Sequence, residues 1–149
     1  MRLYTFGNYY LSSIQQGIQA AHLTAELFTK YTNELRDVHT PDGVLYEWAT
    51  NHKTMVCLNG GNNSELAEIS DKLFFLGKAL GLPSTEFRED VDSLGGITTC
   101  CGIVVPTYLY EGAQEARGVD TITRSYLVPN LGNDQWALID LLNSCGLAR

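Results

Sequence analysis

Residues 12–28 constrain the fold more than any other stretch, because they carry two side-chain stripes at helical spacing. One stripe is apolar and predicts the face that docks on a core. Its members are Ile14, Ile18, Ala21, Ala25 and Phe28. The other stripe is polar and lies on a neighbouring face. Its members are Gln15, Gln19, His22 and Glu26. A helix needs only the apolar stripe to pack, so the polar stripe is a candidate for function.

The length of 149 residues suits one domain, residues 1–149, with a core of ordinary size. Its apolar runs are too short to span a bilayer. Residues 1–10 lack the basic region and apolar stretch of a signal peptide, so we expect a cytoplasmic protein with no membrane partner.

Four cysteines stand at positions 57, 100, 101 and 145, without CxxC or His-x-Cys spacing. This pattern favours reduced, mostly buried thiols over a metal site or a disulfide framework. The three histidines lie on separate segments with no paired ligand motif, and no Gly-x-Ser-x-Gly motif occurs. We therefore expect no metal and no cofactor.

The chain is acidic, with 17 Asp and Glu against 10 Lys and Arg and a net charge of −7. Binding to an extended nucleic acid depends on basic residues that displace counterions. The basic residues here are scattered singly, which disfavours such binding. A small anionic ligand held by one or two basic side chains remains compatible with the sequence.

The rest of the chain alternates strand-like and helical patterns, which predicts an α/β fold. We expect helices packed on the faces of a mixed sheet of four or five strands. The expected strands are residues 2–6, 53–58, 85–88, 97–105 and 121–128. The expected helices are 13–31, 62–80, one or two turns in 111–117, and a last helix from Asn133 or Asp134 to Asn143, with Trp136, Ile139 and Leu142 inward.

Local signals give the boundaries of several elements. Ser13 and Gln16 are spaced as a capping box, and so are Asn62 and Glu65. Thr40-Pro41-Asp42-Gly43 is typical of a turn, and Gly81 followed by Pro83 predicts a helix end. We expect 53–58 to be a buried strand and 97–105 to be central in the sheet.

Three segments carry candidate chemistry, each with a structural alternative. Glu89, Asp90 and Asp92 are closely spaced carboxylates that suit a general base or a cation site, or a plain soluble loop. Residues 59–64 precede a helix N-terminus. Their backbone N–H groups suit phosphate binding, or they serve only as a turn and a helix cap. His22 suits proton transfer or packing, and the amides of Gln15 and Gln19 suit reading a nucleobase edge.

Three different short motifs follow one another within residues 2–106. They are Gln19-Ala20-Ala21-His22, Leu80-Gly81-Leu82-Pro83, and Thr99 with Gly102, Ile103 and Pro106. Together they resemble the type II peptidyl-tRNA hydrolase family, whose first helix carries Gln-x-x-His. The resemblance implies that family's mixed four-stranded sheet for residues 1–106, with 107–149 as a C-terminal strand and helix extension.

The resemblance also implies site residues. Gln15 stands where the family has lysine, and Glu89 follows Arg88 where the family has aspartate after arginine. Ser93 is the hydroxyl nearest to the family's threonine. With the carboxylate cluster added, the candidate catalytic residues are His22, Glu89 and Asp90. The candidate ligand-binding residues are Gln15, Gln19, Arg88, Asp92, Ser93 and Thr99.

These observations support three functions of different classes. The first is a divergent hydrolase acting on a nucleotide-containing substrate such as a tRNA end, with Arg88 as the anion contact. The second is a non-catalytic module that binds a small nucleotide ligand. The third is a protein-interaction or homo-oligomerisation domain, favoured by the tyrosine-rich composition and by residues 107–149.

Overall fold

The computed structural model describes the whole chain except residues 32–36, 38 and 149. Its centre is a four-stranded sheet in the order β2-β1-β4-β3. The strands are β1 (Arg2–Gly7), β2 (Met55–Asn59), β3 (Ser84–Arg88) and β4 (Thr98–Val105). β1 pairs with β2 in parallel, whereas β4 is antiparallel to both β1 and β3. The sheet is therefore mixed and β4 is central, as predicted.

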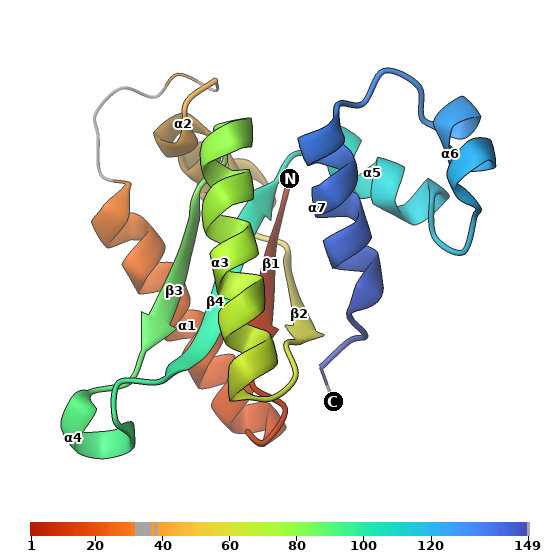
Figure 1. The fold of residues 1–149 in the computed structure, drawn as a ribbon. Helices are drawn as coiled ribbons and strands as arrows, with labels where there is room; N and C mark the ends of the chain where they lie inside the picture. The colour runs from red at the N-terminus through yellow and green to blue at the C-terminus, as the bar shows by residue number, and fades with distance from the viewer. Residues whose placement is uncertain (32–36, 38, 149) are drawn as a thin grey trace.

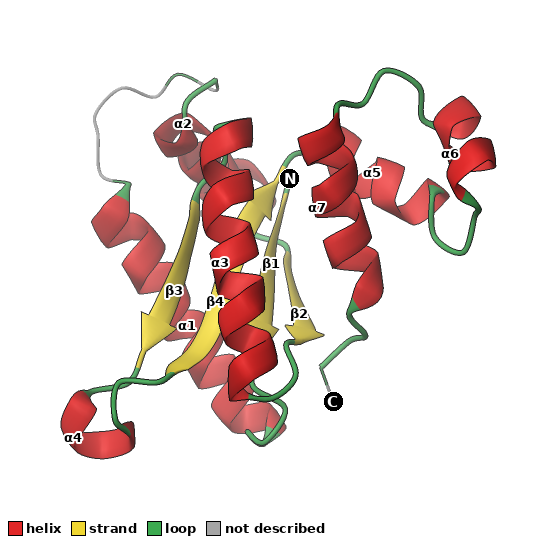
Figure 2. Cartoon of the chain, in the orientation of Figure 1, coloured by secondary structure: helices red, strands yellow, loops and turns green. Residues whose placement is uncertain are grey.

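Two long helices cover the two faces of the sheet (Figures 1 and 2). α1 (Ser13–Lys30) packs on β3 and β4 from one side, and α3 (Asn63–Leu80) packs on the same strands from the other. Two glycines permit close contact. A Cβ on Gly102 of β4 would meet Leu23 of α1, and one on Gly77 of α3 would meet Ser84 of β3.

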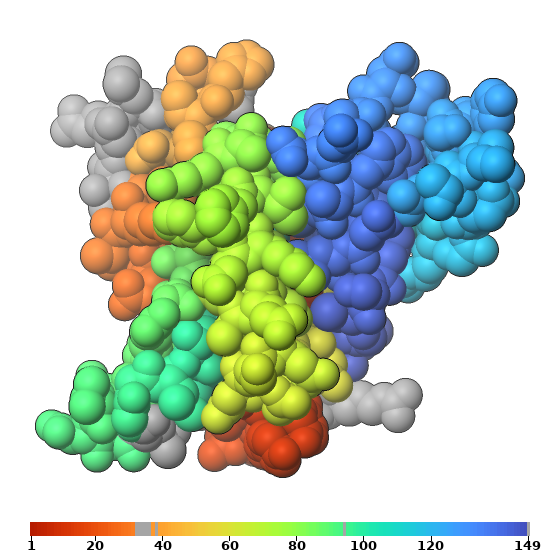
Figure 3. Space-filling view, viewed as in Figure 1, coloured from red at the N-terminus to blue at the C-terminus, as the bar shows by residue number. Residues whose placement is uncertain are grey.

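The remaining helices are short and lie around this three-layer core. α2 (Pro41–Glu47) continues into a π-helical turn, η1 (Trp48–His52), and α4 (Val91–Leu94) follows β3. After β4 come α5 (Thr107–Glu115), α6 (Thr121–Leu127) and α7 (Asn133–Ser144). α7 packs on α5 and lies beside α3 (Figure 3).

The two long helices begin and end through local hydrogen bonds. Asn62 and Glu65 form the predicted capping box of α3, and Gly81 ends that helix in the left-handed region with φ of 65°. The capping box of α1 uses Ser12 and Gln15, one residue before the predicted pair. The predicted extents of both helices are confirmed within one or two residues.

The predicted core-facing stripe of α1 is wrong. Ile14, Ile18 and Phe28 are 77%, 48% and 42% exposed, and the two alanines of the stripe are exposed as well. The buried face consists of Gln16, Gln19, Ala20, Leu23 and Leu27. The two leucines provide the apolar contact with the sheet, and each buried glutamine finds a hydrogen-bond partner. The polar side chains therefore do not exclude this face from the core.

Three other expectations are corrected. Thr40–Gly43 is the start of α2 rather than a turn, because the Thr40 hydroxyl caps the N–H of Gly43. β2 is an edge strand with Met55 exposed. Residues 121–128, expected as a fifth strand, form α6, whose first N–H groups are capped by Asp120. The described part of the extension holds three helices, and Trp136 of α7 is only half-buried.

The core joins the sheet to the C-terminal helices. Leu109, Leu138 and Ile139 are fully buried in the same apolar cluster as Leu3 and Phe6. All four cysteines are free, with Cys100 and Cys101 buried. Burial, together with the neighbouring Cys57, raises the pKa of Cys100 to about 12. Among the described helices none is long and apolar enough to cross a membrane.

Candidate functional site

The candidate residues gather at one end of the sheet. β1, β2 and β3 run in the same direction, since β1 is parallel to β2 and both β1 and β3 are antiparallel to β4. Their carboxyl ends therefore lie together, next to the N-termini of α1 and α3 (Figure 1). In open α/β sheets, ligands bind outside the carboxyl ends of such strands.

Gln19 connects α1 to the segment after β3. It is buried, and its Nε2 donates a hydrogen bond of 2.6 Å to Oε1 of Glu89. The backbone N–H of Glu89 donates to the carbonyl of Ile97 across 3.1 Å, which fixes the backbone at this residue. The Oε1 of Gln19 is buried and has no hydrogen-bond partner among the described residues.

His22 lies one turn further along α1 and remains exposed. Its ring contacts the ring of Phe87 on β3, with centroids 4.7 Å apart and planes tilted by 52°. The aromatic contact orients the imidazole on the same side of β3 as Glu89. The ring is thus oriented by Phe87 while it stays in contact with solvent.

Thr99 contributes a second buried polar atom. It is only 2% exposed, and its Oγ1 has no partner in the described part of the chain. Its carbonyl accepts the N–H of Asn8 across 3.2 Å. The Asn8 side chain donates to Asn63 at the start of α3. Buried polar groups are nearly always hydrogen-bonded, so the unpaired atoms of Gln19 and Thr99 are exceptions. They lie on opposite faces of the sheet, because the alternation along β4 from Gly102, which faces Leu23 of α1, directs Thr99 toward α3.

Arg88 does not join this group. Side chains alternate along a strand, and Arg88 therefore points to the face opposite Phe87 and toward α3. There its Nε donates to Oε1 of Glu86 across 2.6 Å. The expected anion contact is thus paired with a carboxylate of its own strand.

The other candidate residues are peripheral. Gln15 is exposed, and its Oε1 accepts the N–H of Ser12 across 3.0 Å. Asp90, Asp92 and Ser93 are exposed in and around α4. Among the described residues, no hydrogen bond or ion pair joins these three to α1, and no group of three metal-ligating side chains is close enough to hold an ion.

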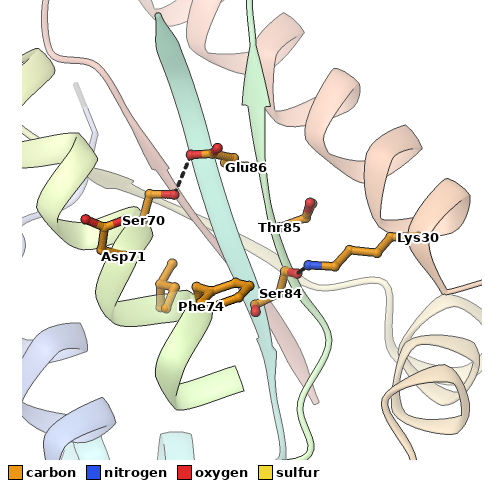
Figure 4. Close-up of a pocket in the computed structure, with 8 residues that line it drawn as sticks. Lys30, Ser70, Asp71, Phe74, Ser84, Thr85 and Glu86 are labelled. Atoms are coloured by element: carbon orange, nitrogen blue, oxygen red, sulfur yellow. Dashed lines mark hydrogen bonds between the residues drawn. The ribbon is translucent and has the colours of Figure 1, made fainter. Parts of the chain in front are cut away.

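A cavity of about 450 Å³ lies at the outer edge of β3 (Figure 4). Glu86 lines it and accepts hydrogen bonds from Ser70 Oγ at 2.6 Å and Thr98 Oγ1 at 3.0 Å. Burial would raise the pKa of Glu86, but the hydrogen bonds from Ser70, Arg88 and Thr98 outweigh it and lower the pKa. Lys30 spans the opposite wall and donates to the Ser84 carbonyl across 2.7 Å.

Sequence reasoning missed Asn8, Asn63 and the hydrogen-bonded set around Glu86. The only local signal for Asn8 was its position directly after a strand, in Gly7-Asn8. Ser70, Glu86 and Thr98 meet only because α3 crosses β3 and β4, so no sequence spacing connects them.

No protein-family model matches the chain, and no curated protein is significantly similar to it.

Proposed function

We propose that this chain is a divergent protein of the type II peptidyl-tRNA hydrolase kind, acting on a nucleotide-containing ester such as a peptidyl-tRNA end. Two observations support the proposal. The sheet is mixed and four-stranded, as the resemblance in residues 2–106 implies. The residues that match the family's Gln-x-x-His motif, Gln19 and His22, point toward the carboxyl end of β3.

The contact between Gln19 and Glu89 carries the proposal. Glu89 stands at the position of the family's carboxylate, and Gln19 at the position of its glutamine. These two motif residues are 70 positions apart in sequence, yet they share a 2.6 Å hydrogen bond. A resemblance confined to the scaffold would not require the two matched side chains to meet.

The geometry supports hydrolysis by general acid and base catalysis. Only one oxygen of Glu89 receives the Gln19 hydrogen bond, so the carboxylate retains capacity to take a proton from water. The water oxygen bonds to the ester carbonyl carbon, the bond from that carbon to the ribose oxygen breaks, and protonated His22 supplies a proton to the leaving oxygen. The unpaired Oε1 of Gln19 lies beside this carboxylate and is the candidate acceptor for a polar group of the substrate.

Release of peptide from peptidyl-tRNA tests the proposal. Glu89→Gln keeps an acceptor for Gln19 but removes the base, and we expect a rate loss of about 100-fold or more. Glu68→Gln, on the exposed side of α3, is its matched control. His22→Ala should also lower the rate, whereas His39→Ala, at another exposed histidine, should not. A wild-type protein without turnover contradicts hydrolysis.

The position of Gln15 favours a second candidate, a non-catalytic module that binds a nucleotide. Gln15 replaces the lysine that the family carries, and its side chain closes the capping box of α1 instead. Calorimetry with adenosine and cytidine monophosphate tests this candidate. Binding with full recovery of the nucleotide, no ester cleavage by the wild type, and cleavage gained in Gln15→Lys would favour it. Absence of nucleotide binding would exclude it.

A further inference from the structure

α1 is apolar on both of its faces. The inner stripe, with Leu23 and Leu27, packs on the sheet. The outer stripe of Ile14, Ile18, Ala21, Ala25 and Phe28 faces away from the sheet and is exposed. α1 thus carries two separate apolar stripes, of which the fold covers only the inner one. The outer stripe is therefore an exposed apolar surface suited to a partner.

The spacing of the outer stripe specifies a helix as that partner. Its members follow one another at alternating intervals of four and three residues. This is the spacing of the a and d positions of a heptad, which form the seam between two paired helices. The inner stripe, by contrast, is the broad face of a helix lying on a sheet.

We propose that two copies of this chain pair through the outer stripe of α1, with the two helices antiparallel. The first half of the stripe is large (Ile14 and Ile18) and the second half is small (Ala21 and Ala25). An antiparallel pair sets Ile14 against the partner's Ala25 and Ile18 against the partner's Ala21. Large side chains then fill the space left by small ones. A parallel pair would crowd one end and leave a gap at the other.

The charge distribution also fits a second copy. The chain carries a net charge of −7, so most of its surface repels a copy of itself. From Ser13 to Ala25, however, α1 contains no Asp, Glu, Lys or Arg. Two outer stripes can therefore approach without like-charge repulsion. The antiparallel arrangement also places opposite ends of the two helix dipoles together.

The pairing connects to the candidate site. His22 lies on the flank of the stripe that faces β3, as its contact with Phe87 shows. Gln15 lies seven residues earlier and hence on the same flank. In the antiparallel register, His22 of one copy runs beside the partner's Gln15. The inference does not depend on the proposed hydrolase or binding function, because pairing is measured by mass alone.

Sedimentation equilibrium tests the pairing. One helix pair buries less than the standard interface of about 800 Å² per partner, so measurements should extend from about 1 to 500 µM. We expect the mass to rise with concentration to twice the 16.5 kDa of one chain. Ile18→Glu should weaken association at least 100-fold, because it buries an unpaired charge in the seam.

Ile122→Glu is the matched control, since Ile122 is an exposed isoleucine of a different helix, α6. Circular dichroism confirms that both variants stay folded. A wild type that remains monomeric throughout overturns the proposal. So does a dimer that survives Ile18→Glu, or one that Ile122→Glu disrupts.

Disulfide crosslinking tests the antiparallel register. In a background with Cys57→Ser and Cys145→Ser, a mixture of the Ile14→Cys and Ala25→Cys proteins should form a crosslinked dimer on oxidation. Each protein oxidised alone should remain without a covalent crosslink. Efficient crosslinking of either protein alone would overturn the antiparallel arrangement.

Discussion

The Nε2 of Gln19 lies 2.6 Å from Oε1 of Glu89, and this hydrogen bond fastens α1 to the segment that follows β3. The two residues lie on neighbouring elements of one sheet face, next to the exposed ring of His22. Gln19 is buried, so its amide would be costly without a partner. The pair therefore serves the fold as well as the candidate site.

Replacing this amide by a carboxylate should destabilise the protein. Gln19→Glu places two carboxylates in contact and removes the donor, and we expect the free energy of unfolding at pH 7 to fall by about 2 kcal/mol. Urea denaturation measures the change. Gln15→Glu, at an exposed cap position, should change the free energy by less than about 0.5 kcal/mol.

The reversed pair supplies a stricter control. Gln19→Glu combined with Glu89→Gln restores one amide and one carboxylate, so the double variant should regain most of the lost stability. Additive losses in the double variant would show that the two side chains do not interact.

Thr99→Val should separate stability from ligand binding. Valine has nearly the same shape and removes a buried hydroxyl that has no partner among the described residues. We expect the free energy of unfolding to stay constant or rise by up to about 1 kcal/mol. Peptidyl-tRNA turnover and nucleotide affinity should stay unchanged, because Thr99 faces α3 and lies away from Gln19 and His22.

Thr98→Val is the comparison for this variant. Thr98 donates to Glu86 across 3.0 Å, so its loss should cost about 1 kcal/mol of stability. If Thr99→Val were the more destabilising of the two, the hydroxyl of Thr99 would have a structural partner after all.

The stability of the protein should depend on Glu86 in acid. Its pKa in the folded state lies below the ordinary value of 4.5. The ionised carboxylate therefore stabilises the fold above pH 4.5, and that contribution disappears as the pH falls through the folded pKa. Glu86→Gln should lower the free energy of unfolding at pH 7.

The difference between wild type and this variant should shrink steadily below pH 4.5. Urea denaturation at pH 7, 4.5 and 3 measures it, with Glu68→Gln as the exposed control. A difference that grows in acid would contradict the assigned direction of the pKa.

Gly102 should not tolerate a side chain. A Cβ there would lie 2.6 Å from the Tyr4 carbonyl oxygen and 2.7 Å from Cδ2 of Leu23. The backbone oxygen belongs to a central strand and cannot move aside. We expect Gly102→Ala to cost about 2–4 kcal/mol, visible as a lower Tm.

Gly17→Ala provides the opposite expectation in the same assay. A Cβ on Gly17 would meet nothing within 4 Å, and the residue lies inside α1. Alanine should therefore stabilise the helix by about 1 kcal/mol. Equal Tm values for the two variants would mean that α1 does not approach β4 as closely as the structure places it.

The candidate site was predictable only where chemistry follows directly from a motif. The sequence motifs identify Gln19, His22 and Glu89, and the structure places them around one strand end. The same motifs include Arg88, but the alternation along β3 directs its side chain to the other face, where it contacts Glu86. The unpaired state of the Thr99 hydroxyl was invisible in the sequence, because it depends on what surrounds the start of β4.

Residues 121–128 were expected to form a fifth strand, but both edges of the sheet already have hydrogen-bond partners. The outer edge of β2 is occupied by residues 146–148, through hydrogen bonds of Asn59 and Cys57 to Gly146 and Ala148. At the edge of β3, Lys30 and Tyr31 hydrogen-bond to the backbone of Ser84. The segment instead forms a helix that Asp120 caps locally.

Local sequence signals predict where the long helices begin and end, because caps such as Asn62 and helix ends such as Gly81 act on their own backbone neighbours. The sequence also predicts a helix with one apolar stripe beside a polar one. Which face of that helix is buried depends on contacts between segments that are distant in sequence. Leu23 packs over Gly102, and Gln19 forms a hydrogen bond with Glu89. The face of α1 that holds these two side chains is therefore buried. The purely apolar stripe of Ile14 and Ile18 remains outside, because contacts distant in sequence outweigh local hydrophobicity.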